Sequence, residues 1–335
     1  MSPSLRFELE DVEMAWYEWC VKYLRETGMK NITERRKKFK ETLKAFLILS
    51  PAMILIFIFY VIPIVQNIWL SFTNYSVVHM YDYEFIGFEN YKYIFSEGIN
   101  GLSRLIIWTF IFAITVVFAA FCIATVLAVI LNNNNIKLGA IYRTIFIIPW
   151  VIPSVITLLI WRGLLNTNYG FINNLLELAG FKRVPWLTHP FAAKISVIFI
   201  TVWYSFPYFM VVALGMLQSI PRQLYEAAEI DGSSKLRNFM CITIPHLLKG
   251  MMPTLIMAFI MQFNQFGIYI VTNGGPAGER LGDPGATDLL LTYVYNMAFR
   301  VFRYDLAATY SVIIFIFMAI FALSNMKISR RFLND

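Results

Sequence analysis

The polar side chains best placed to recognise a ligand are three amides inside an apolar stretch. Gln262, Asn264 and Gln265 fall between residues 251 and 271, which contain no Asp, Glu, Lys or Arg. Amides surrounded by hydrocarbon need hydrogen-bond partners, which another helix or a hydroxyl-bearing ligand can supply. At helical spacing Gln262 and Gln265 share one face, while Asn264 points about 100° away from Gln265. Two interpretations stay open, bonds between helices or contacts with a neutral ligand.

A second candidate segment, residues 219–250, joins two apolar stretches and is polar. Pro221 suits the first turn of a helix, Gly232 permits a bend and Pro245 fixes the exit. The segment therefore predicts two short helices with a hinge, small enough to enter a groove of another protein. The residues that stand out in it are Glu226, Ala227, Ala228, Asp231, Gly232, Ile242 and Pro245.

Covalent chemistry has few candidates in this sequence. It contains no GxxxxGK[ST] loop to hold a nucleotide, and neither an HExxH nor a GxSxG motif. His79, His189 and His246 are scattered over separate loops, and the three cysteines show no CxxC spacing. We therefore expect no catalytic residue, no metal site and no cofactor bound by this chain.

The elements that must position these residues are apolar. The sequence is 58% hydrophobic and 15% charged, whereas soluble domains average about 45–50% apolar and about 25% charged. Six stretches approach the ~20 residues that a membrane-spanning helix needs. They are 46–72, 105–131, 144–165, 192–217, 251–271 and 306–325. The sequence predicts an all-α integral membrane protein with six transmembrane helices.

Positive charges predict the orientation of these spans. With the N-terminus inside, all but nine of the 28 Lys and Arg residues fall in cytoplasmic segments. The prediction is therefore N-in and C-in, and the net charge of +7 reflects topology rather than binding to nucleic acid.

Charge is absent from the middle of every span, whereas proton-coupled carriers normally place ionisable groups there. This absence indicates a neutral substrate and an external energy source. Prolines are expected to interrupt the spans instead, at Pro63, Pro149, Pro153, Pro207 and Pro253.

The predicted domain organisation has three parts, an N-terminal cytoplasmic arm (1–45), a transmembrane domain (46–325) and a cytoplasmic tail (326–335). The arm places Trp16, Tyr17, Trp19 and Tyr23 before a basic cluster at 35–44. A topology-fixing basic patch and a regulated docking site for lipid or a partner are both open interpretations. Its first 30 residues do not read as a cleaved secretory signal.

The segment around Glu226 resembles the EAA loop of bacterial ABC-importer permeases. That pattern is EAA, three residues, Gly, nine residues, Ile, any residue and Leu-Pro. The positions in register are Glu226, Ala227, Ala228, Gly232, Ile242 and Pro245, with Ile244 in place of the leucine. The resemblance implies that 226–232 docks into a cytoplasmic ATPase subunit and transmits its closure to the membrane helices.

Further runs are similar to the maltose-permease branch of carbohydrate importers. They include Ile148-Pro-Trp-Val-Ile-Pro153, Trp203-Tyr-Ser-Phe-Pro-Tyr208 and Thr272-Asn-Gly-Gly-Pro276. The resemblance implies a type I ABC-importer fold and sugar contacts at Tyr208, Gln262 and Gln265, with Asn264 adjacent. Glutamines replace the family's asparagines at 262 and 265, so maltodextrin is a less specific expectation than sugar.

The same resemblance implies the assembly. A second homologous permease, two copies of a cytoplasmic ABC ATPase that uses ATP and Mg, and an extracellular or periplasmic sugar-binding protein are the expected partners, in a bacterial inner membrane. Another oligosaccharide, or glycerol phosphate, is an alternative substrate. A secondary carrier or a channel is an alternative mechanism, and copurification of an ATPase distinguishes it from an importer.

Overall fold

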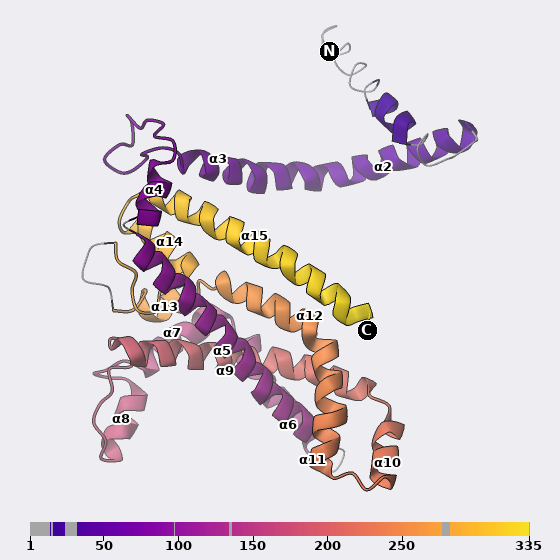
Figure 1. Ribbon diagram of the computed structural model, residues 1–335. Coiled ribbons are helices and arrows are strands. Elements are labelled where there is room, and N and C mark those ends of the chain that lie inside the picture. The colour runs from indigo at the N-terminus through magenta and orange to yellow at the C-terminus, as the bar shows by residue number, and fades with distance from the viewer. Residues whose placement is uncertain are drawn as a thin grey trace. The chain divides into compact units, whose positions relative to one another are not determined.

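The chain is mainly helical in the described part of the computed structural model, which comprises residues 14, 16–23, 32–96, 98–133, 136–276 and 282–334. Within it, β pairing is limited to an isolated bridge between Thr73 and Phe85. Figure 1 shows the helices, which are α2 (Ile32–Ile56), α3 (Ile62–Leu70), α4 (Glu89–Ser96), α5 (Ile99–Leu131), α6 (Gly139–Val151), α7 (Ser154–Leu164), α8 (Phe171–Leu178), α9 (Pro190–Ser219), α10 (Arg222–Ile230), α11 (Lys235–Asn238), α12 (Ile244–Phe263), α13 (Ile268–Thr272), α14 (Leu290–Phe299) and α15 (Tyr304–Asn334).

Two compact units make up the chain, Met1–Gln66 and Asn67–Asp335. In the first unit, the helical segment 16–23 folds back on α2. Trp16 meets Phe46 edge-on at 5.5 Å between ring centroids, and Tyr17 meets Phe39 at 6.0 Å. Residues 1–13, 15 and 24–31 of the expected N-terminal arm lie outside the described residues.

Five helices in the described residues are long and apolar enough to cross a membrane, and α6 with α7 would make a sixth. The expected span at 144–165 is broken in the structure, because α6 and α7 meet at an angle of 89° next to Pro153, one of the expected proline interruptions. Ile152 is extended there, as residues before proline prefer. The expected boundaries at residues 46 and 326 fall inside α2 and α15, so no helix end marks them.

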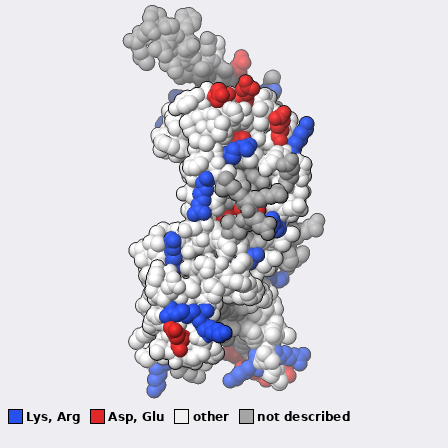
Figure 2. Space-filling model, turned by 90° about the vertical axis from the view of Figure 1, so that its left-hand side faces the viewer, with Lys and Arg blue, Asp and Glu red and all other residues white. Residues whose placement is uncertain are grey.

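The core of the second unit forms where α5 packs along α9, with α12 against both. Small residues on α5, among them Ala120, Ala124 and Ala128, are buried and let the backbones approach closely. Met210, Ala213 and other α9 side chains fill the facing surface. On the face drawn in Figure 2, most of the visible surface carries neither acidic nor basic side chains, as lipid contact requires.

Two prolines are accommodated by π-helical turns. Phe57–Val61 precedes Pro63, and Phe239–Thr243 precedes Pro245. A π turn shifts the hydrogen-bond register, so the missing N–H of proline two residues later does not end the helix. The predicted exit at Pro245 is therefore wrong. Helices also continue through Pro207 and Pro253, and only Pro153 marks a sharp break among the expected proline interruptions.

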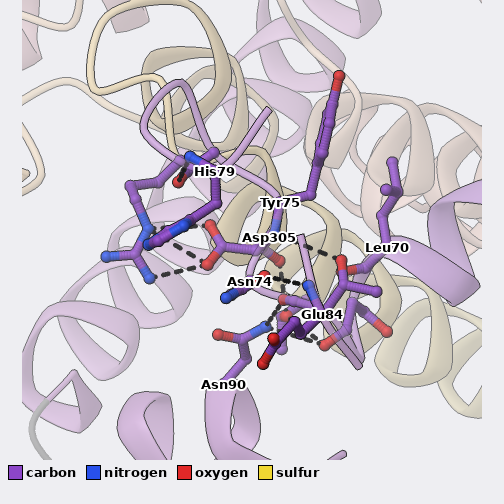
Figure 3. Close-up of polar contacts among 12 residues, drawn as sticks. Leu70, Asn74, Tyr75, His79, Glu84, Asn90 and Asp305 are labelled. Carbon is purple, nitrogen blue, oxygen red and sulfur yellow. Dashed lines mark hydrogen bonds and ion pairs between the residues drawn. The ribbon is translucent and has the colours of Figure 1, made fainter. Parts of the chain in front are cut away.

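Polar contacts tie the loop after α3 to the start of α15, as Figure 3 shows around Asp305, Tyr75 and Asn90. The backbone N–H of Asp305 donates to the carbonyl of Tyr75 at 2.9 Å. The buried Asp305 carboxylate accepts three hydrogen bonds from the Arg303 guanidinium, which raise the pKa of Arg303. The loop and the head of α15 are therefore held together at the beginning of the span.

Asn90 closes the same contact from α4, and replacing it with leucine should destabilise the protein. Its buried amide donates to the carbonyls of Ser71 at 3.1 Å and Thr73 at 2.8 Å. Losing a buried donor costs about 1–3 kcal/mol. We expect a lower midpoint of thermal unfolding in detergent for Asn90→Leu. The matched control is Asn100→Leu, because Asn100 is exposed and its side chain makes no hydrogen bond among the described residues. An equal loss in both variants would contradict the prediction.

Candidate functional site

The segment 219–250 forms two helices joined by a left-handed turn. α10 ends at Asp231, and Gly232 follows with φ +76°, a conformation that glycine adopts at little cost. The Gly232 N–H donates to the Glu229 carbonyl at 3.0 Å. The Ser234 hydroxyl then accepts from the Arg237 N–H and caps α11. The hinge therefore lies at Gly232, but the second helix is long, because it continues through α12.

The outer surface of this segment is unusually apolar for a polar loop. Glu226 and Ala227 are exposed, and so are Ile230 (87%), Leu236 (68%) and Met240 (57%). Exposed apolar side chains of this kind, here next to Lys235 and Arg237, are typical of surfaces that contact another protein or the membrane. We call residues 219–250 the docking segment, after the expected contact with a cytoplasmic ATPase.

Tyr225 anchors the docking segment to the membrane helices. Its hydroxyl bonds the Thr243 hydroxyl at 2.8 Å, so α10 is held against the second helix. Tyr225 and Ile242 also pack on the core cluster of α5, α9 and α12. Movement of α10 would thus reach the transmembrane core directly. Tyr225 was not among the predicted site residues. An aromatic residue directly before the exposed Glu-Ala-Ala run could have indicated the side of α10 that faces the protein core.

The predicted amides do not share a helix face. α12 ends at Phe263 and Asn264 caps it, so the expected helical spacing of Gln262 and Gln265 is wrong. Gln262 is buried (8% exposed), and its side-chain oxygen has no hydrogen-bond partner among the described residues. Asn264 is exposed. The next helix, α13, begins four residues after Asn264.

Gln265 instead bonds neighbouring protein groups. Its amide nitrogen donates to the Tyr204 hydroxyl, and its oxygen accepts from the Gly267 N–H at 3.1 Å. The sequence left two interpretations of the amides open, bonds between helices or contacts with a neutral ligand. In this conformation Gln265 makes a bond of the first kind, to Tyr204 of α9. Its contact with a ligand stays a prediction.

Tyr208 lies one turn beyond Tyr204 on the same face of α9. The Tyr208 ring is 38% exposed and is tilted against Trp150 of α6 at 5.8 Å. Tyr204 thus brings Gln265 close to the face that carries Tyr208, whereas no described contact joins Tyr208 to Gln262 or Asn264. Sequence analysis missed Tyr204, which the spacing of four residues could have indicated.

Asp288 organises the loop between α13 and α14. Its buried carboxylate accepts from the Gly285 N–H at 2.9 Å, the Thr292 hydroxyl at 2.9 Å and the Asn296 amide at 3.1 Å. Asn296 also accepts from the Tyr269 hydroxyl at 2.9 Å, which connects the network to α13. Burial raises the pKa of Asp288, and these hydrogen bonds oppose that rise. The network holds α13 directly after the turn that contains Gln265.

The helical arrangement agrees with the comparison to known proteins. Residues 120–332 match the family described as "Binding-protein-dependent transport system inner membrane component". The chain belongs to this family. The permease is 30% identical over 293 residues to the galactooligosaccharides transport system permease protein GanP of Bacillus subtilis (strain 168), covering 86% of this chain and 70% of GanP.

A second relative is the maltose/maltodextrin transport system permease protein MalF of Klebsiella aerogenes, 36% identical over 254 residues. That match covers 73% of this chain and 49% of MalF, so the permease spans about half the length of that relative. The fold is similar to a chain of a bacterial ABC transporter involved in the import of the acidic polysaccharide alginate. The TM-score is 0.68 at 23% identity, with coverage of 88% of this chain and 98% of the other.

These findings confirm the expected type I ABC-importer permease fold and the inner-membrane location. The family describes the membrane component of a transport system that depends on a binding protein. ATP hydrolysis in ABC importers lies in a separate subunit, so the permease itself is not an enzyme.

Proposed function

We propose that this permease conducts a neutral oligosaccharide into the cytoplasm by alternating access. The observation that carries the proposal is the buried Gln262 oxygen, which lacks a partner among the described residues and lies in the stretch 251–271, where there are no charged residues. A sugar hydroxyl can donate to this oxygen, while the exposed ring of Tyr208 offers an aromatic face. Relatives named for maltose, maltodextrin and galactooligosaccharides support a sugar as the substrate.

The proposed assembly has a second homologous permease, two ATPase copies that use ATP and Mg, and an external sugar-binding protein. The docking segment supports the ATPase contact, because its exposed Ile230 and Leu236 would be covered by a partner. Glu226, Ala227, Ala228 and Gly232 would form the contact, and the anchor at Tyr225 would transmit ATPase closure to the core.

Gln262→Met tests the sugar contact. Methionine has a similar length and removes the unpartnered oxygen, so the thermal midpoint should not fall. Uptake should weaken, with the half-saturating sugar concentration rising about three- to tenfold, as expected when one hydrogen bond is lost. The measurement is ATP-dependent uptake of labelled maltotriose and galactotriose into proteoliposomes containing the assembled transporter.

The control is Gln218→Met, because Gln218 is an exposed glutamine near the end of α9 whose side chain has no hydrogen bond among the described residues. Unchanged uptake by Gln262→Met would remove Gln262 from the sugar site. Uptake of neither trisaccharide by the wild type, or uptake independent of ATP, would contradict the proposed function itself.

A further inference from the structure

A polar cavity of about 520 Å³ lies at the end of α7 that adjoins α13. The two helices lie side by side, with the Arg162 guanidinium donating to the Ile270 carbonyl at 3.3 Å (Figure 1). Small-molecule sites generally measure about 300–1,000 Å³. The polar residues that line the cavity are Arg162, Asn166, Thr167, Tyr169, Thr188, Thr272 and Asn273.

Several of these lining groups have no protein partner. The side chains of Tyr169, Thr188 and Asn273 make no hydrogen bond among the described residues, and Arg162 has no ion pair among them. The Arg162 guanidinium has five N–H donors, and its only described hydrogen bond is the one to Ile270. A guanidinium fork, a phenol and an amide around one cavity match the paired hydroxyls of a sugar ring.

An apolar cluster borders the cavity and the predicted sugar site. Leu158, Leu165, Ile200 and Val271 are its buried members, and Val271 also lines the cavity. Leu158 lies against the turn that carries Gln265, since a Cβ at Gly267 would come within 2.9 Å of its side chain. The cavity is thus one short helix, α13, away from Gln265 along the chain.

We propose that this cavity is an outer sugar subsite, which binds one unit of the oligosaccharide before it passes the apolar cluster toward Gln262. Arg162, Asn273 and Tyr169 would bind its hydroxyls. The proposal rests on the proposed function, because it takes a neutral sugar as the substrate. It assigns these residues a role in recognition that is separate from the amides at 262–265.

A larger side chain at position 163 would fill the proposed subsite. Gly163 lines the cavity, and a Cβ at this position would meet no atom within 4 Å. Gly163→Leu should therefore occupy the cavity without a protein clash, and Gly163→Ala is the matched control. We expect Gly163→Leu to lower ATP-dependent uptake of maltotriose and galactotriose about tenfold. Gly163→Ala should transport like the wild type, and basal ATPase activity of both assembled variants should be unchanged.

Asn273→Gly provides an independent test should Gly163→Leu fail to assemble. Asn273 has φ +51°, which glycine also adopts, so the variant removes the amide and keeps the backbone. We expect its half-saturating sugar concentration to rise about threefold.

The two proposals fail in different ways. Wild-type uptake with no effect of Gly163→Leu or Asn273→Gly would overturn the outer subsite alone. Absence of ATP-dependent uptake by the wild type would overturn the sugar-import function and the subsite with it.

Discussion

Replacing Gly232 with proline is expected to abolish ATP-driven uptake while the permease remains folded in the membrane. Gly232 has φ +76°, whereas proline is restricted to about −65°. Proline also removes the N–H that bonds the Glu229 carbonyl. The direction of α10 relative to α11 must then change, and the surface around Glu226 would no longer fit the ATPase. Uptake and ATPase stimulation by the loaded binding protein are the measurements.

Gly180→Pro is the matched control for this result. Gly180 follows α8 and has φ +82°, and its N–H bonds the Glu177 carbonyl at 3.0 Å. Proline at this position would therefore also lose an N–H hydrogen bond and conflict with a positive φ. Because α8 lies between the third and fourth predicted spans, which the N-in topology places outside and away from the ATPase, coupling should survive. Gly232→Ala should lie between wild type and Gly232→Pro, since a left-handed alanine costs about 1–2 kcal/mol. Coupling by Gly232→Pro equal to that of Gly180→Pro would argue against a hinge that transmits force.

Replacing Asp288 with alanine is expected to have the largest effect on stability. Donors from Gly285, Thr292 and Asn296 would lose their acceptor in a buried site, at about 1–3 kcal/mol for each unsatisfied group. The connection through Asn296 to Tyr269 would also weaken. We expect little folded protein to be recovered from the membrane, and a clearly lowered thermal midpoint in whatever is recovered.

Asp288→Asn tests the hydrogen bonds of the carboxylate while it keeps the shape of the side chain. The asparagine is nearly isosteric, but its NH₂ group must face at least one donor, so a loss of about 1–3 kcal/mol is expected. Asp82→Ala is the control, because the Asp82 side chain is 73% exposed and its change should stay within about 0.5 kcal/mol. If Asp288→Ala unfolded at the wild-type temperature, the network would not be holding α13 in place.

Much of the architecture could be predicted because membrane insertion depends on local composition. Runs of about 20 apolar residues and the distribution of Lys and Arg are properties of each segment by itself. The hinge at Gly232 was also predictable, since a glycine after a short helix commonly adopts the left-handed conformation that the structure has. The short helices α4, α8 and α14 were not predicted, because each has only 8 to 10 residues and is too short to stand out as a membrane span.

The arrangement of the amides at 262–265 was predicted less well. Continuing a helix through Gln265 was the natural extrapolation from an apolar run, but α12 ends at Phe263. The bond from Gln265 to Tyr204 joins residues on two different helices, and no periodicity within one helix reveals it. The proline interruptions show the same limit, because whether a proline breaks a helix depends on a π turn and on the packing around it.

The sequence by itself determined the membrane class, the approximate spans, the polar character of the segment 219–250 and the absence of charge from the middle of the spans. Each of these depends on the identity of neighbouring residues and on their transfer from water to lipid. Tertiary structure alone decided the bend between α6 and α7, the buried and unpartnered oxygen of Gln262, the Asp288 network and the cavity beside Arg162. These features arise from side chains far apart in the chain, whose hydrogen bonds and packing are settled only when the helices meet.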